Sequence, residues 1–93
     1  MVADLSTGKP YSEYEEFDYT VRIFDESVSG DDLVWHRDKN TRLISVVDAN
    51  EWMFQFDNEL PFQLRDHMIF LIPKETYHRL IKGNGTLKIK IRE

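Results

Sequence analysis

The chain has 93 residues, a hydrophobic content of 41% and a formal net charge of −5. This length indicates one domain, and the acidic balance argues against the clustered basic face that nucleic-acid binders need. The chain has no cysteine, which excludes disulfides, thiol chemistry and cysteine-ligated metal sites. Any metal ion must therefore be held by histidines and carboxylates.

The N-terminal segment, residues 1–16, is polar, acidic and rich in tyrosine, and it lacks the apolar stretch of a signal peptide. This segment has two interpretations: it is a loose tail, or it forms a strand that pairs with a barrel edge or with a partner. We divide the chain into this tail and a domain at 17–93. No apolar run approaches the roughly 20 residues that span a membrane, so we expect a cytoplasmic protein without a membrane partner.

From residue 19 onward, short apolar segments with alternating or continuous patterns follow one another, separated by turn-forming residues. The predicted strands are 19–24, 33–38, 42–47, 51–56, 61–64, 68–72, 77–81 and 86–92. The run 68–72 is continuously apolar, which is typical of a strand buried on both faces. No segment has a sustained helical period, so the pattern favours an all-β sandwich or barrel.

Two of the three histidines stand in a pattern that favours metal chemistry. His36 and Asp38 are two residues apart on a predicted strand, so their side chains share one face. His78 begins a later strand and comes opposite the pair if the sheet closes. Two histidines and one carboxylate are the ligand set of mononuclear Fe(II) oxygenases, and the same set also holds Mn, Ni, Co or Zn. A salt bridge or loop hydrogen bond is the alternative explanation of the His36–Asp38 pair.

The spacing of these residues resembles the two signature motifs of the cupin superfamily. Gly30 and His36 match the first motif, and Pro73 and His78 match the second. The stretch between the motifs, residues 50–66, is short, as in compact cupins. The resemblance covers about residues 19–92, and it implies a small jelly-roll barrel, the double-stranded β-helix.

The chain also departs from these motifs. Asp38 stands where the family has its second histidine, and Arg42 stands at the position of the glutamate ligand. The family's glycines and asparagine are replaced by Ala49, His67, Glu75 and Lys82. The resemblance thus implies a site that keeps His36 and His78 and takes Asp38 as its third ligand. Arg42 cannot ligate a metal because it has no acceptor, and its charge repels a divalent cation.

Arg42 and Gln55 are the candidate ligand-binding residues. Three readings of Arg42 are open: it pairs with Asp38 in place of a metal, it clamps a carboxylate or phosphate of a ligand, or it points to solvent. Gln55 shares a strand face with Met53, opposite the aromatic stripe of Trp52, Phe54 and Phe56. Gln55 would orient a ligand if its face is the interior, and it is solvated otherwise.

The leading hypothesis is a small cupin-like protein that binds a polar or anionic small molecule in the barrel. A divalent metal (Fe, Mn, Ni or Zn) at His36, Asp38 and His78 would support dioxygenase- or isomerase-like activity. The alternative is a metal-free, non-catalytic cupin acting as a sensor or interaction module, and a third class is a structural subunit of an assembly. A homodimer is the family expectation, and an exposed aromatic stripe would be consistent with it.

Overall fold

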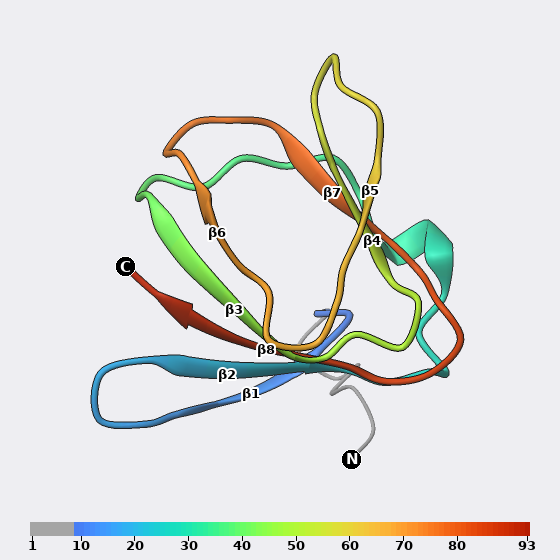
Figure 1. The fold of residues 1–93 in the computed structure, drawn as a ribbon, viewed down its shortest axis with the longest axis horizontal. Helices are drawn as coiled ribbons and strands as arrows, with labels where there is room; N and C mark the ends of the chain where they lie inside the picture. The colour runs from blue at the N-terminus through green and yellow to red at the C-terminus, as the bar shows by residue number, and fades with distance from the viewer. Residues whose placement is uncertain (1–8) are drawn as a thin grey trace.

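The protein, here a computed structural model, is described over residues 9–93 and forms two antiparallel sheets around one core (Figure 1). The first part of the predicted tail lies outside the described residues. The larger sheet has the order β1-β2-β8-β3-β6, and the smaller has the order β5-β4-β7. In chain order the strands are Ser12–Glu15 (β1), Thr20–Phe24 (β2), Arg42–Asp48 (β3), Met53–Phe56 (β4), Phe62–Gln63 (β5), Ile69–Ile72 (β6), His78–Ile81 (β7) and Leu87–Arg92 (β8). The predicted all-β barrel is confirmed.

The core follows from the period of two in the central strands. Along β3, Ile44 and Val46 are buried between residues that are less buried, and β8 has the same alternation. Trp52 is fully buried, and its Nε1 donates a hydrogen bond of 2.8 Å to the carbonyl oxygen of Gly85. This bond satisfies the one polar atom of the indole, so the largest side chain of the core is buried without an unpaired donor.

The segment 33–38 was predicted as a strand, and this prediction is wrong. A 3-10 turn at Gly30–Asp32 precedes it, capped by the side chain of Ser29. Within the segment only His36 makes a sheet pairing, an isolated bridge to His78. The next contact is a hydrogen bond of 2.7 Å from the backbone N–H of Glu75 to the carbonyl oxygen of Asp38. The segment therefore follows β7 and the turn before it without becoming a continuous strand.

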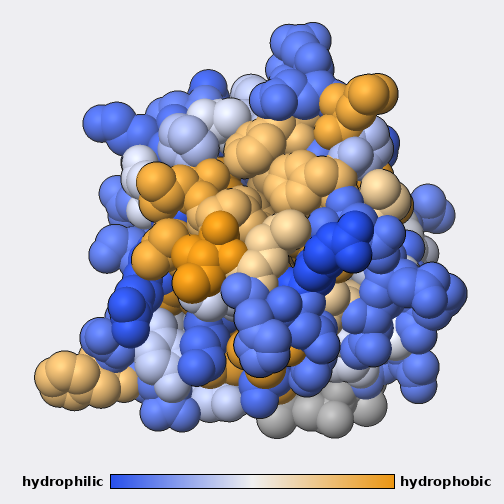
Figure 2. Space-filling view, in the orientation of Figure 1, coloured by the Kyte–Doolittle hydropathy of each residue, from blue (hydrophilic) through white to orange (hydrophobic). Residues whose placement is uncertain are grey.

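The run 68–72 was predicted to be buried on both faces, and this is also wrong. Strand β6 lies at the edge of the larger sheet and pairs only with β3 among the described strands. Ile69 and Leu71 point outward and are 64% and 57% exposed, whereas Ile72 is buried. An apolar run does not distinguish a central strand from an edge strand whose outer face is uncovered. Figure 2 shows apolar side chains gathered over the middle of one face of the molecule.

Strand β4 starts later than predicted because residues with positive φ form the turn before it. Strand β4 begins at Met53, because Asn50 and Glu51 have φ of 44° and 64° and form the preceding turn. His67 and Glu75, which replace glycines of the resembled motifs, have φ of 70° and 60°. These two positions keep the backbone conformation that glycine adopts most easily.

Strand β1 comes from the predicted tail and pairs antiparallel with β2 at the other edge of the larger sheet. Tyr11, just before it, packs with its ring 5.2 Å from that of Phe24, so this part of the tail contacts the core. The described part of the chain contains no helix with the length and apolarity needed to cross a membrane.

Candidate metal centre and ligand pocket

The two motif histidines meet through their backbones. His36 N–H donates to the carbonyl oxygen of His78 at 3.0 Å, and His78 N–H donates back to that of His36 at 2.9 Å. This reciprocal pair fixes the two imidazole rings with their centroids 4.4 Å apart. Asp38 follows two residues after His36, and one ligand atom from each of the three side chains lies within 4.8 Å of the others. The structure thus brings the three predicted metal ligands to one point.

Each imidazole is held by its Nδ1 atom. His36 Nδ1 lies 3.0 Å from the carbonyl oxygen of Val34, and His78 Nδ1 lies 2.7 Å from that of Thr76. A carbonyl oxygen only accepts, so both Nδ1 atoms carry the proton and donate. In the neutral rings the Nε2 atoms therefore have free lone pairs. Backbone bonds of this kind orient histidine ligands of metal ions.

Asp38 supplies two oxygens with different surroundings. Its Oδ1 lies 3.4 Å from Arg42 Nη1 and 4.0 Å from His36 Nε2. Its Oδ2 lies 3.3 Å from His78 Nε2, is buried, and has no hydrogen-bond partner among the described residues. A buried carboxylate oxygen without a partner is costly, so a proton or a cation is expected beside it.

His78 is the buried member of the group, 3% exposed, and its ring stacks on Phe54 at 5.3 Å. This burial lowers the pKa of His78 below its ordinary value of 6.5, and the nearby His36 and Arg42 lower it further. The bond to Thr76 and the charge of Asp38 oppose the shift without reversing it. His78 is thus neutral near pH 7, which is the form that ligates a metal ion.

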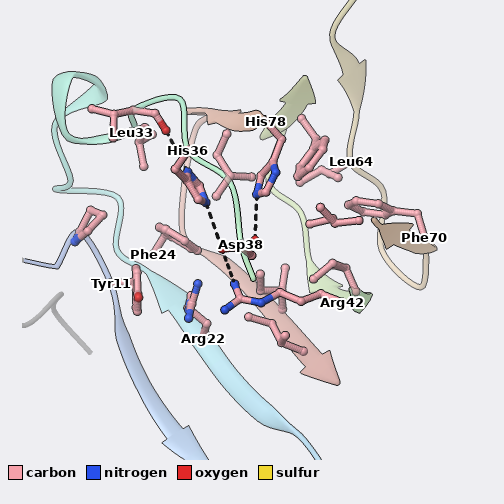
Figure 3. A pocket seen from close by; sticks show the side chains of 18 of the residues that line it. Tyr11, Arg22, Phe24, Leu33, His36, Asp38, Arg42, Leu64, Phe70 and His78 are labelled. Carbon is pink, nitrogen blue, oxygen red and sulfur yellow. Dashed lines mark hydrogen bonds and ion pairs between the residues drawn. The ribbon is translucent and has the colours of Figure 1, made fainter. Parts of the chain in front are cut away.

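The three side chains lie in the wall of a pocket of about 250 Å³ between the two sheets (Figure 3). Most of the remaining wall is apolar and comes from β2, β3, β4, β6, β7 and β8; it includes Phe24, Ile44, Phe54, Phe70, Ile72, Leu80 and Ile91. His36 has 46% of its side chain exposed, whereas Asp38 has 12%. The candidate metal group therefore lies between an accessible imidazole and an apolar interior.

Arg42 also lines this pocket, with 20% of its side chain exposed. Besides its contact with Asp38, its Nε donates to Glu93 Oε2 at 2.8 Å. The reading in which Arg42 points to solvent is therefore wrong. Its guanidinium holds Oδ1 of Asp38 and leaves Oδ2 facing His78, so an arginine at a family ligand position is compatible with a metal on Oδ2.

Gln55 lies outside the pocket. Its Oε1 accepts a hydrogen bond of 2.9 Å from Arg79 Nε, and its Nε2 donates to the carbonyl oxygen of Glu59 at 2.9 Å. The aromatic face of the same strand, with Trp52 and Phe54, is the interior one. The prediction that Gln55 faces a ligand in this pocket is therefore corrected, because the parity of β4 places it on the outer face.

Arg22 is a pocket residue that sequence reasoning missed. The alternation of 19–24 places it on the same face as Phe24, which is buried in the core. A charged residue sharing a strand face with a core aromatic was the available signal. Its guanidinium stacks 3.9 Å from the ring centroid of Tyr11.

Comparison with known proteins identifies the fold. No family model and no curated protein sequence matches the chain. Several solved structures match it in fold. A cupin-2 domain containing protein from Shewanella frigidimarina has a TM-score of 0.63 at 23% identity, over 88% of this chain and 78% of that one. An RmlC-like cupin family protein with a double-stranded β-helix fold, from Methanocaldococcus jannaschii, has a TM-score of 0.64 at 9% identity, over 90% and 80%.

A third similar structure is FeII HppE in complex with its substrate. Its TM-score is 0.64 at 14% identity, over 89% of this chain and 52% of that one, so this chain spans about half of the HppE chain. At these identities the comparisons establish the fold. They confirm the resemblance to the cupin superfamily at the level of the fold. With its two-sheet topology and both motif histidines at one point, the protein is a small barrel of the cupin fold.

Proposed function

We propose that the protein binds one divalent metal ion through Nε2 of His36, Nε2 of His78 and Oδ2 of Asp38. The observation that carries this proposal is the buried Oδ2, which has no hydrogen-bond partner among the described residues and lies 3.3 Å from Nε2 of His78. Two histidine nitrogens and one carboxylate oxygen suit Fe, Mn, Ni or Zn. Three protein ligands leave positions open for a small molecule.

The proposed ligand is a small polar or anionic molecule bound in the adjoining pocket. When bound, the metal would polarise a ligand oxygen or support oxidation, which are the steps of an isomerase- or dioxygenase-like reaction. The protein's own residues would orient the ligand: the apolar wall excludes water, and Arg42 offers a cation to an anionic group. FeII HppE, which has the same fold, holds Fe(II) and a substrate together.

Metal analysis of protein purified without a histidine tag tests the metal site. We expect about one metal ion per chain, and a loss of metal in His36→Ala and His78→Ala with the fold retained by circular dichroism. His67→Asn is the control, because His67 lies in a turn with positive φ, which asparagine tolerates, and outside the metal group. A wild-type protein that takes up none of these metals, or full metal content in both alanine variants, would contradict the proposal.

The alternative function is a metal-free sensor or interaction module. The ion pair of Arg42 with Asp38 at 3.4 Å favours it, because the guanidinium already neutralises the carboxylate. The metal analysis separates the two functions, since this module would bind its ligand without a metal ion.

A cytoplasmic location and the division of the chain at residue 16 remain predictions from the sequence.

We also propose that the chain forms a homodimer through an apolar patch of Ile69 and Leu71 on the outer face of the edge strand β6. These side chains are 64% and 57% exposed. A second copy suits this patch because an uncovered edge strand can pair antiparallel with its own copy, which satisfies its free backbone groups.

A further inference from the structure

The pocket has a second polar feature, formed by Arg22 on β2 and Arg42 on β3. Both guanidiniums line the pocket, and their side chains are only 14% and 20% exposed. Figure 3 shows them on the same side of the His36–Asp38–His78 group, with their nitrogen atoms turned toward one region. Two guanidiniums that share a largely apolar pocket favour an anion between them.

Arg22 is held in place before any ligand arrives. Its guanidinium stacks 3.9 Å from the centroid of the Tyr11 ring, and its Nε and Nη2 each lie 3.0 Å from Glu13 Oε2. A guanidinium has five N–H donors, and Glu13 engages only some of them. The stacking and the ion pair therefore fix Arg22 while leaving donor capacity for a ligand.

Outside the metal group, the carboxylate partners of these arginines are Glu13 and Glu93, and both lie on the outer side. The side chains of Glu13 and Glu93 are 29% and 43% exposed, more than those of Arg22 and Arg42. The two arginines also line a second hollow, whose other residues include Glu13, Glu15, Glu16, Asp18 and Glu93. They therefore form a wall between an acidic outer hollow and the pocket. An anion is repelled on the outer side and meets the guanidiniums only from within the pocket.

The charges around the pocket select the charge of the ligand. Among the residues that line the pocket, the two positive charges of Arg22 and Arg42 oppose the two carboxylates of Asp32 and Asp38, which leaves a formal charge of zero. A divalent ion at the proposed metal site changes this to +2. The metal-loaded pocket thus attracts an anion and repels a cation.

The apolar wall selects the rest of the ligand. Phe24, Ile44, Phe54, Phe70 and Ile72 supply aromatic and aliphatic surface around a volume of about 250 Å³. This is below the range of roughly 300–1,000 Å³ that holds drug-sized molecules. We infer that the ligand is a small monocarboxylate with an apolar body, whose carboxylate lies on Arg22 and Arg42 and whose body packs against this wall. The inference rests on the proposed function and names its substrate class.

Isothermal titration calorimetry with benzoate, benzyl alcohol and benzylamine tests this inference, because the three probes share one ring and differ in charge. Acetate tests the need for an apolar body. We expect benzoate to bind the metal-loaded protein at least about tenfold more tightly than each of the other probes. Removal of the metal should weaken benzoate by at least about tenfold, through the loss of two positive charges.

The variant Arg22→Gln separates this inference from the metal site, since the contacts of Arg22 are with Glu13 and Tyr11 and not with the three metal ligands. It should keep its metal and bind benzoate about tenfold more weakly or worse. Arg92→Gln is the matched control, because Arg92 pairs with Asp18 on the exterior and lines neither hollow. Equal binding of benzoate and benzyl alcohol, or unchanged benzoate affinity in Arg22→Gln, would overturn the inference. Absence of metal from the wild type would instead overturn the proposed function.

Discussion

His78 Nε2 lies 3.3 Å from Oδ2 of Asp38, and in the neutral histidine neither atom has a hydrogen to share. Two buried acceptors facing each other destabilise the metal-free protein. We therefore expect Asp38→Asn to raise the stability of the metal-free protein by about 1 kcal/mol, because the amide can donate to Nε2. The same variant should lose its metal. Urea unfolding with a chelator and metal analysis measure the two effects, and a less stable metal-free variant would contradict this account.

Metal binding should stabilise the native protein in proportion to the free metal concentration. At a hundredfold excess over the dissociation constant, we expect a gain of about 2.7 kcal/mol, provided that the unfolded chain does not bind. The melting temperature should therefore rise with added Ni²⁺ or Mn²⁺ and fall back with a chelator. His36→Ala removes the exposed ligand and should lose this response, whereas His67→Asn should keep it. Equal responses in wild type and His36→Ala would contradict the assigned ligands.

The metal-free protein should lose stability as the pH falls toward the acid side of neutrality. Burial lowers the pKa of His78 in the folded state below 6.5, so the unfolded chain binds this proton at higher pH. Stability is therefore full above 6.5, falls as the pH drops from there to the folded pKa, and is level below it. Urea midpoints between about pH 5 and 8 measure this slope. The slope should flatten in His78→Gln and persist in His67→Asn.

Gly83 should be the least replaceable glycine of the described chain. A Cβ at this position would meet backbone atoms of Asn50, Glu51 and Trp52, which cannot move as a flexible side chain can. We expect Gly83→Ala to cost about 1–3 kcal/mol or more through overpacking. Gly30→Ala is the control, since nothing lies within 4 Å of its added Cβ. Equal denaturant midpoints for the two variants would show that the turn relaxes freely.

The proposed dimer should depend on the exposed side chains of β6. A charge on the patch opposes burial in an interface, so Leu71→Lys should shift the protein to monomers. Phe17→Lys is the control, because Phe17 is fully exposed in the turn between β1 and β2, outside the patch. Light scattering after size-exclusion chromatography measures the mass. A monomeric wild type, or a Leu71→Lys variant that remains dimeric, would refute this interface.

The sequence predicted most strands because local alternation reports burial directly. Two predictions were wrong: a strand at 33–38 and a strand buried on both faces at 68–72. The segment 33–38 follows a 3-10 turn at Gly30–Asp32 and pairs only at His36, so it is not a continuous strand. The apolar run 68–72 could not show that β6 is an edge strand, because edge position depends on which strands lie alongside.

The sequence by itself determined the types of ligand at the candidate site, and the spacing that brings His36 and Asp38 onto one side. Only the tertiary structure decided that His78 joins them, since this depends on a backbone bridge between segments far apart in the chain. Only the tertiary structure placed Arg22 and Arg42 in the same pocket and Gln55 outside it. The physical reason is that alternation assigns a residue to one of two faces, whereas closure of the barrel decides which face is the interior and which residues meet across it.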